Sequence, residues 1–410
     1  MRSRIQTVQA LVVVLFASVI LLSQPEFITW QKIFGTEDRA GGKTEDIPAK
    51  IFLLKDGGYL ITGDARCSNG AGDPCGMSVI KLDKNGSVSW MRFPAGDRNI
   101  YTAYPGVFVD LSEGGFVFGG KKYFSLGLTR IDDSAKIIWD RKYDLNNAND
   151  MLTVAEMADK NIAAILLGRG DSKALMLVVD KNGNVVSVKK IPAELDGFSA
   201  GGVSKTRDDG FILAGVKYVA VYGQGGLTNQ DVRVLKLNGQ GGVAWDRTFG
   251  GAGQDFGRSA SQTTDGGFIV AASSSITPAK KELEFLVIRL DANGNRLWEK
   301  NYGSPDSCRI RSCYETSDGG IICAGTRMGS AGNHYMLVKL DARGNKVWEK
   351  FYGGGRFNIL LNCFAIAPDG GFIMAGKLED WPASMTDYYV VKTDDKGNIA
   401  PQPSEIKSLQ

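Results

Sequence analysis

The sequence of 410 residues predicts an all-β fold, a seven-bladed β-propeller made of four-stranded antiparallel blades. Three observations lead to this prediction: a tryptophan that recurs about every fifty residues, two glycine-containing turns in each repeat, and strands that are apolar on both faces. The chain has 52 glycines and only 12 prolines, so many tight turns are expected without Pro-rich disorder.

A tryptophan at the start of a predicted strand marks six of the repeats. In the seventh repeat, Ser187 occupies that position within the segment 178–189. Successive positions lie 48 to 60 residues apart, which is the length of a propeller blade. We expect the tryptophans to be structural and to dock between blades. The repeats start near residues 30, 90, 139, 187, 245, 298 and 348, and the tryptophans are Trp30, Trp90, Trp139, Trp245, Trp298 and Trp348.

Each repeat carries two turn signals. The first is D-G-G before an apolar run, as at 56–58, and the second is D-x-x-G before the tryptophan, as at 83–86. A repeat therefore reads as strands a, b, c and d, with these turns joining a to b and c to d. In an antiparallel meander both turns fall on one face of the disc, which we call the turn face. The variable b–c connections fall on the other face, which we call the loop face.

The strands and the chain ends also fit a closed ring. Runs such as 268–272 and 285–288 are apolar throughout, as expected for sheets covered on both faces by neighbouring blades. The last repeat has no tryptophan strand after Asn398, whereas the strand at Trp30 has no blade before it. We therefore expect the Trp30 strand to complete the last blade and close the ring, in a propeller domain spanning residues 24–400.

The N-terminus predicts export. Residues 1–23 read as a signal peptide or an N-terminal anchor, because Arg2 and Arg4 precede an apolar run from Ala10 to Leu22. The expected location is periplasmic, cell-surface or secreted, with membrane contact only if this segment stays uncleaved. Residues 401–410 read as a polar C-terminal tail.

The cysteines and the charge narrow the expectations further. Cys67 and Cys75 bracket a short loop, and in an exported protein we expect them to form a disulfide. The sequence leaves the pairing of Cys308, Cys313, Cys323 and Cys363 open. The formal net charge is +3 and the charged residues are interspersed, which argues against nucleic acid as a partner. We expect a monomer.

Two motifs resemble known bacterial repeats. The motif K-L-D-x-x-G-N-x-x-W-x-K-x-[FY]-G, as in 339–353, resembles the tryptophan-docking repeat of PQQ-like propellers. The motif D-G-G-F-I-x-A-G, as in 369–376, is similar to the delta-60 repeats of bacterial surface proteins. The resemblance implies a propeller with docked tryptophans. Quinone-dependent members of the PQQ-like family have eight blades and an adjacent-cysteine disulfide, whereas this chain has seven repeats and no adjacent cysteines, so we expect no cofactor.

Residue patterns typical of catalytic and metal sites are weak. The turns at Asp83 and Asp180 place glycine at the fourth position rather than the sixth, so they do not fit a calcium loop. The chain has one histidine, His334, which rules out a polyhistidine metal site. We therefore predict no metal site and assign no catalytic residue.

The predicted binding residues lie on the loop face and at the mouth of the central channel. Loop aromatics on a rigid scaffold are typical of binding surfaces, although they can also pack onto the blade tops. Polar residues at the start of strand a can form a ligand site or simply a solvated lining. The candidates are Tyr218, Tyr222, His334, Tyr335, Trp381 and Tyr388 near the loops, and Asp46, Asp255, Arg258 and Arg309 at the channel mouth, with Arg311 nearby.

Three functional hypotheses follow. The first is a non-catalytic extracytoplasmic binding or scaffold propeller that engages a protein or glycan through the loop face. The second is a glycan-active hydrolase or lyase that uses carboxylate, tyrosine and arginine side chains at the channel mouth. The third is a structural role in envelope assembly.

Overall fold

A computed structural model gives the architecture of the chain. The residues that it describes are 28–34, 44–67, 76–92, 107–122, 125–145, 148–168, 174–192, 198–220, 228–251, 253–275, 282–303, 306–330, 332–355, 357–380 and 385–399. Within these residues no helix is long and apolar enough to cross a membrane.

The strands group into seven blades in chain order. Blades 1 to 4 consist of β2 (Thr44–Leu53), β3 (Tyr59–Cys67), β4 (Gly76–Leu82) and β5 (Val88–Arg92); β6 (Phe108–Asp110), β7 (Phe116–Lys122), β8 (Ser125–Ile131) and β9 (Ile137–Tyr143); β10 (Ala148–Glu156), β11 (Ile162–Gly168), β12 (Leu175–Val179) and β13 (Val185–Lys190); and β14 (Phe198–Lys205), β15 (Phe211–Ala220), β16 (Thr228–Leu237) and β17 (Val243–Phe249). Blades 5 to 7 consist of β18 (Asp255–Gln262), β19 (Phe268–Ser274), β20 (Glu284–Leu290) and β21 (Arg296–Tyr302); β22 (Ser307–Glu315), β23 (Ile321–Gly329), β24 (Gly332–Leu340) and β25 (Lys346–Tyr352); and β26 (Phe357–Ile366), β27 (Phe372–Asp380), β28 (Met385–Lys392) and β1 (Trp30–Phe34).

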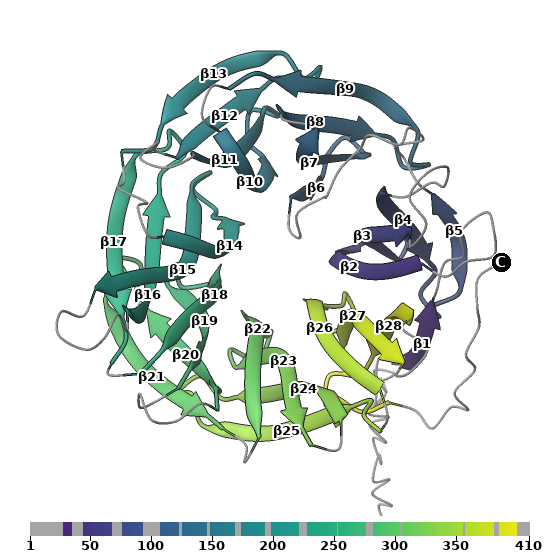
Figure 1. The fold of residues 1–410 in the computed structure, drawn as a ribbon, viewed down its shortest axis with the longest axis vertical. Helices are drawn as coiled ribbons and strands as arrows, with labels where there is room; N and C mark the ends of the chain where they lie inside the picture. Colours follow the sequence, from purple (N-terminus) through teal and green to yellow (C-terminus); the bar gives the residue numbers. More distant parts are fainter. Residues whose placement is uncertain are drawn as a thin grey trace, which may run out of the picture.

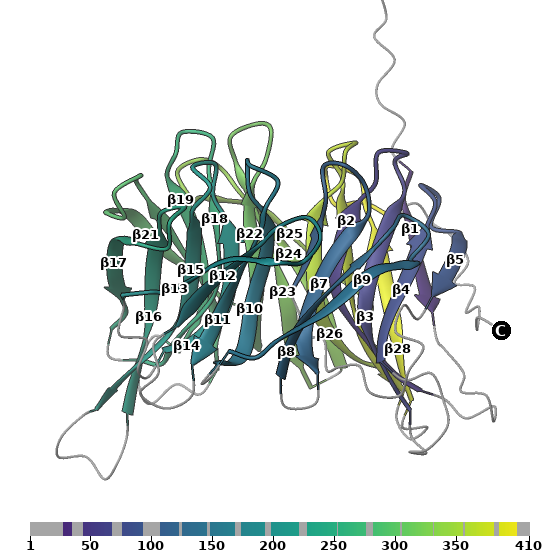
Figure 2. The same cartoon turned by 90° about the horizontal axis from the view of Figure 1, so that it is seen from above.

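The predicted seven-bladed propeller is confirmed. Each blade is an antiparallel meander, and its first strand lies innermost around the central opening (Figure 1). Seen from the edge, the blades stand side by side in one disc, with connections at both faces (Figure 2). Blades 7 and 1 also share a single parallel contact between Glu45 and Thr386.

The ring is closed by β1, as the sequence predicts. β1 pairs antiparallel with β28 in a register from Trp30 opposite Lys392 to Phe34 opposite Tyr388. Trp30 and Phe34 are both buried, so this strand contributes core side chains as well as ladder hydrogen bonds. The last blade therefore takes three strands from the end of the propeller domain and one from its beginning.

The recurrent tryptophan packs on the D-x-x-G turn of the next blade. A Cβ placed on Gly183 would lie 3.1 Å from the Trp139 ring, and one on Gly344 would lie 2.9 Å from the Trp298 ring. The Trp139 Nε1 also donates a hydrogen bond to the Lys181 carbonyl at 2.8 Å. Glycine is thus required at this turn for two reasons. Its φ is positive, and the indole leaves no room for a side chain.

The two turn signals of a repeat are linked by an ion pair between a largely buried cation and a more exposed aspartate. The lysine or arginine two residues before the D-x-x-G aspartate reaches the aspartate of the D-G-G turn on the neighbouring hairpin, as Lys339 does to Asp318 at 2.7 Å. The same pair recurs in blades 1, 4, 5 and 7, as Lys81 with Asp56, Lys236 with Asp208, Arg289 with Asp265 and Lys392 with Asp369. These pairs hold both hairpins of a blade together at the turn face.

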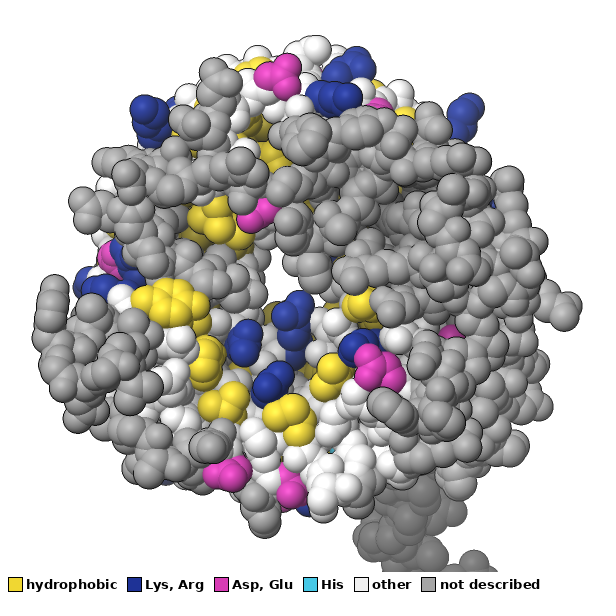
Figure 3. Space-filling view, in the orientation of Figure 1, with side chains coloured by type: hydrophobic (Ala, Val, Ile, Leu, Met, Phe, Trp, Pro, Cys, Tyr) yellow, Lys and Arg dark blue, Asp and Glu magenta, His cyan; other side chains and the backbone are white. Residues whose placement is uncertain are grey.

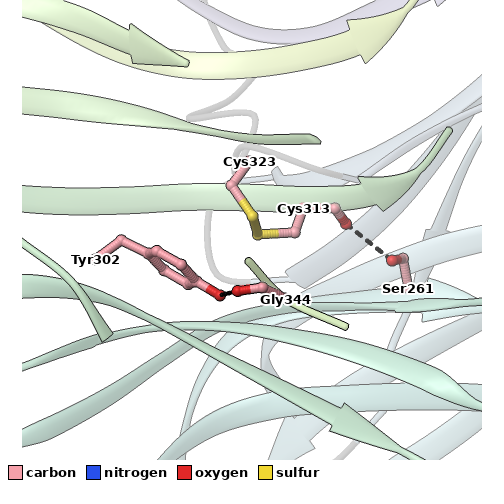
Figure 4. Close-up of a disulfide and its surroundings, with 5 residues drawn as sticks. All are labelled: Ser261, Tyr302, Cys313, Cys323 and Gly344. Carbon is pink, nitrogen blue, oxygen red and sulfur yellow. Dashed lines mark hydrogen bonds between the residues drawn. A yellow bond between two sulfur atoms is a disulfide. The ribbon is translucent and has the colours of Figure 1, made fainter. Parts of the chain in front are cut away.

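The cysteines resolve part of the open pairing. Cys313 and Cys323 lie opposite each other on β22 and β23 and form a disulfide, with a Cα–Cα distance of 4.1 Å (Figure 4). Cys308 and Cys363 are buried free thiols. The predicted pairing of Cys67 with Cys75 lies outside the described residues, because Cys75 is not among them.

Candidate functional site

The innermost strands surround a cavity of about 1210 Å³ at the centre of the ring. Residues from all seven blades line it, so it is a channel of the whole propeller and not a pocket within one blade. In a view onto the loop face, dark-blue Lys and Arg side chains gather on one side of the central opening (Figure 3). The cavity is therefore cationic on one side.

A β-bulge recurs at the same level of the innermost strands. In six blades one residue of strand a is left without a register partner, opposite the fourth and fifth residues of strand b. Bulges re-aim side chains and are common beside functional sites. The bulged residues are Ala49 in β2, Leu152 in β10, Gly201 in β14, Arg258 in β18, Arg311 in β22 and Asn362 in β26.

Three arginines form a cluster on the adjacent strands β18 and β22. Arg258 and Arg311 hold equivalent bulge positions and both line the cavity, while the exposed Arg309 lies two residues before Arg311. The Arg258 guanidinium lies 5.7 Å from the ring centre of Phe256, and the Arg311 Nε donates a hydrogen bond to the Asn362 carbonyl at 2.5 Å. These contacts orient two of the three guanidiniums without neutralising them. We call Arg258, Arg309 and Arg311 the arginine cluster.

The arginine cluster carries uncompensated positive charge. Within the described part of the chain, no carboxylate forms an ion pair with any of its three members. Burial lowers the pKa of Arg258 below its ordinary value, and the neighbouring guanidiniums of Arg309 and Arg311 lower it further. An arginine stays protonated even so, and like charges held together favour binding of an anion.

The opposite side of the channel is mainly apolar at the same level. There the bulges present Leu152 and Ala49, and β10 lies across the ring from β22 (Figure 1). Lys50 also lines the cavity, where its Nζ donates to the Phe108 carbonyl at 2.6 Å. Burial lowers the pKa of Lys50 to about 8, against the opposing effect of Asp110. At the bulge level the channel is thus two-sided, with arginines on blades 5 and 6 and apolar side chains on blades 1 and 3, while the carboxylates of Asp110 and Asp150 also line the cavity.

The predicted channel-mouth residues divide into two groups. Arg258 and Arg309 lie in the arginine cluster. Asp46 is fully buried, Asp255 is only 3% exposed, and neither lines the cavity, so the expected exposure of these carboxylates at the channel mouth is wrong. The alternation of strand a explains the difference, because their positions at the start of the strand point between blades.

Asp255 nevertheless has an unusual electrostatic environment. Burial raises the pKa of Asp255, although hydrogen bonds from Ser274 and the Gly251 amide oppose this effect. Burial and the neighbouring Asp255 carboxylate also raise the pKa of Asp231. Both carboxylates lie against Gly250, where a Cβ would sit 2.4 Å from an Asp231 oxygen and 2.9 Å from an Asp255 oxygen. They form a close carboxylate pair between blades 4 and 5.

Of the predicted aromatic residues that the structure describes, one is exposed and two are buried. Tyr218 is 48% exposed near the end of β15. Tyr335 and Tyr388 are fully buried instead of exposed, because the hydroxyl of Tyr335 donates to the Tyr389 carbonyl and that of Tyr388 lies 2.6 Å from the Ser78 hydroxyl. Both tyrosines therefore belong to seams between blades.

The remaining predicted residues are His334, Tyr222 and Trp381. His334 lies within β24 and not in a loop, since the β23–β24 connection is a tight hairpin. Its ring packs edge-to-face with Phe351 at 6.4 Å between ring centres. Tyr222 and Trp381 lie outside the described residues. The described residues contain no group of three or more His, Cys, Asp or Glu side chains that could hold a metal ion.

The bulge was not predicted, although the sequence contains a signal for it. The A-G pair that ends the D-G-G-F-I-x-A-G motif lies opposite the bulge, and its glycine accommodates the displaced carbonyl of strand a. A Cβ on Gly325 would lie 2.2 Å from the Arg309 carbonyl oxygen, and one on Gly376 would lie 2.0 Å from that of Leu360. In blades 1, 4, 6 and 7 a glycine at this position of strand b marks the bulge, whereas blades 3 and 5 have Leu166 and Ala272 there.

Comparison with known proteins supports the class of fold. No protein-family model and no curated protein sequence matches the chain. A structure of oligogalacturonate lyase in complex with manganese is 13% identical with a TM-score of 0.52, over 90% of this chain and 98% of that one. A protein from Lactobacillus plantarum is 12% identical with a TM-score of 0.49, over 77% of this chain and 86% of that one. At 13% identity the similarity to oligogalacturonate lyase shows the fold alone.

Proposed function

We propose that the protein is a non-catalytic binding or scaffold propeller that acts outside the cytoplasm. It engages a protein or glycan ligand at its loop face and at the adjoining end of the channel. At the turn face the charged side chains form ion pairs with one another, whereas in the channel the arginine cluster has no carboxylate partner among the described residues. This contrast is the observation that carries the proposal. Function in a propeller resides in such sites and not in the fold itself.

Charged groups at the turn face are used within the protein. The D-G-G aspartates accept ion pairs from the lysines and arginines of their own blades, as Asp318 does from Lys339. Carboxylates at the ends of strand a accept hydrogen bonds from the turn of the preceding blade, as Glu315 accepts from the Thr264 amide at 2.6 Å. The guanidiniums of the arginine cluster have no such carboxylate partner within the described residues. Charged side chains that have no ion-pair partner in a cavity favour the binding of an oppositely charged ligand there.

A capture experiment tests which face binds. The tagged mature chain is incubated with envelope extract beside two variants. One combines Tyr218→Ala with Trp381→Ala, at residues that the sequence assigns to the loop face, and Leu297→Ala on the exposed outer strand β21 is the matched control. We expect the loop-face variant to lose the captured ligand and the control to keep it. Equal capture by all three proteins would contradict binding at the loop face.

A glycan-active hydrolase or lyase is a second candidate, and the Asp231–Asp255 pair favours it. Carboxylates with raised pKa values are typical of general acids in such enzymes. Turnover on a panel of acidic and neutral glycans, lost in Asp255→Asn and kept in Asp246→Asn, would support this candidate. The burial of Asp255 weighs against it, because a substrate needs access to the carboxyl group.

A further inference from the structure

The two-sided channel indicates the chemistry of its ligand. The arginine cluster on β18 and β22 provides three positive charges, and the opposite strand β10 provides Leu152 at the same bulge level. A ligand that fits both sides must present negative charge in one direction and apolar groups in the other.

We propose that the channel binds an extended acidic peptide segment of a partner protein, in which acidic and apolar side chains alternate. This inference rests on the proposed binding function and specifies the partner's chemistry. The acidic side chains face the arginine cluster, and the apolar side chains face the wall formed by Leu152 and Ala49.

The spacing of the arginines carries this proposal. Arg309 and Arg311 lie on one strand and flank the buried Ile310. In a regular strand residues two apart are separated by roughly 6 to 7 Å, which is also the distance between alternate side chains of an extended peptide, and the bulge at Arg311 re-aims that side chain into the cavity. Two acidic side chains separated by one residue can therefore meet Arg309 and Arg311 together, while Arg258 on β18 approaches from the side.

The partners of the arginines favour carboxylates. Arg258 lies over the Phe256 ring and Arg311 is held by the Asn362 carbonyl through its Nε, which leaves the terminal nitrogens of Arg311 free to donate. A guanidinium presents a planar set of donors that matches a carboxylate with two parallel hydrogen bonds. An extended peptide of alternating sequence presents all its acidic side chains to one side, where the arginines lie. A polyanion that is charged on every side would also turn charge toward the apolar wall.

The apolar wall distinguishes a peptide from an acidic polysaccharide. Leu152 lines the cavity from β10, and the neighbouring Met151 and Val154, which are 1% and 3% exposed, form the core behind it. Aliphatic side chains gain free energy by burial against such a wall, whereas sugar hydroxyl groups lose hydrogen bonds to water there. The wall therefore selects for apolar residues between the acidic ones.

Fluorescence anisotropy with labelled probes tests the proposal on the full mature chain. The probes are a short peptide of alternating Glu and Val, a peptide of the same composition with Glu and Val in two blocks, and an oligogalacturonate of equal charge. We expect the alternating peptide to bind about tenfold more tightly than either other probe, with an affinity that falls as salt is raised.

Matched variants locate the site. Arg258→Gln with Arg311→Gln should weaken binding of the alternating peptide by about tenfold or more. Arg296→Gln with Lys346→Gln removes the same charge from exposed outer strands and should leave the affinity unchanged. Leu152→Gln should reduce the preference for the alternating peptide over the block peptide while the salt dependence remains.

Each other result counts against the proposal. Tighter binding of oligogalacturonate would assign the channel to an acidic glycan, and equal binding of both peptides would remove the role of the apolar wall. If Arg296→Gln with Lys346→Gln lost as much affinity for the peptide, the effect would come from the net charge of the protein and not from the arginine cluster. If no probe binds while the loop-face variant still loses its captured ligand, the binding function stands and the peptide proposal is wrong.

Discussion

The two seams on either side of blade 3 are built differently. Toward blade 2, Trp139 is buried on Gly183 and donates to the Lys181 carbonyl, and the hydroxyl of Tyr143 donates to the Gly183 carbonyl at 2.9 Å. Toward blade 4, Ser187 takes the tryptophan position and Ile191 the tyrosine position. The second seam therefore lacks both polar links to the next turn.

A methionine occupies the space that the indole fills elsewhere. A Cβ on Gly241 would lie 3.1 Å from the sulfur of Met176, whereas the corresponding contact at Gly183 is with the Trp139 ring. Methionine is flexible enough to fill an irregular gap, but it makes fewer fixed contacts than an indole. Outside this seam, Val185, Val186 and Val188 of β13 are exposed. The comparison teaches that the ring tolerates one seam without the indole and tyrosine links, although Lys205 still donates to the Glu156 carbonyl and the Ala158 amide to Asp209.

The largest expected effect comes from removing the indole of the stronger seam. Trp139→Ala should lower the free energy of unfolding by about 3 to 5 kcal/mol, because it removes a buried aromatic ring and leaves a cavity. Ser187→Ala, at the equivalent position, should change it by less than about 0.5 kcal/mol. Urea unfolding of both variants measures the difference, and equal effects would mean that the seams do not differ in stability.

An indole introduced into the seam between blades 3 and 4 should stabilise the protein. Ser187→Trp combined with Met176→Leu gives the second seam the indole and removes the longer side chain from its place. We expect a gain of about 1 to 2 kcal/mol in the free energy of unfolding. Ser187→Trp alone should gain less, because the indole and Met176 compete for one space. A double variant no more stable than the wild type would contradict indole docking at Gly241.

The tyrosine link should contribute less. Tyr143→Phe keeps the ring and removes only the hydrogen bond to the Gly183 carbonyl, so we expect a loss of about 1 kcal/mol. Ile191→Val, in the seam that has no such bond, serves as the control for a small change in buried volume. Thermal unfolding compares the two, and no loss in Tyr143→Phe would show that water replaces the hydroxyl there.

Acid should act on the blades that carry the ion pair between the two turns and spare blade 3, where Val178 replaces the lysine or arginine. Although partial burial opposes it, the hydrogen bond from Lys236 lowers the pKa of Asp208 to about 2, and Lys339 does the same for Asp318. An unfolded aspartate titrates near pH 3.9, so this stabilisation is complete above about pH 4 and is lost as the pH falls toward about 2.

Urea unfolding between pH 6 and pH 2 measures this loss, with pH steps of about one unit. Asp208→Asn with Asp318→Asn should make the dependence on pH shallower than in the wild type. Asp159→Asn, at the corresponding turn of blade 3, should leave the slope unchanged, and a shallower slope in that control would assign the acid effect to other carboxylates.

The sequence predicted the blades because each one repeats the same local chemistry. Tight turns need glycine at fixed places, and apolar runs need cover on both faces, so Gly86 and its counterparts mark strand ends directly. The order of strands and the closure by Trp30 followed from counting what the last repeat lacks. The ion pair between Lys339 and Asp318 was missed, because it joins two motifs that are separated in sequence.

The site was harder to predict, because it depends on where each side chain points, which the residue type alone does not determine. Asp46 and Asp255 stand at the expected strand position, yet they point between blades, and Tyr335 and Tyr388 likewise turn inward. Arg258 faces the channel because a bulge shifts the alternation of β18 by one residue. Periodicity alone does not reveal such a shift, and no glycine marks it in β19, where Ala271 and Ala272 lie opposite the bulge.

Closure by β1 also sets an order of events for folding. Trp30 pairs with Lys392, so the first strand of the propeller meets its partner across almost the entire chain. Such distant contacts make folding slow, because a long loop must close before they form. During synthesis the emerging β1 must wait, unpaired, until β28 has left the ribosome. The Trp30 strand is thus made first and placed last, and chaperones that hold extended apolar segments would find their target there.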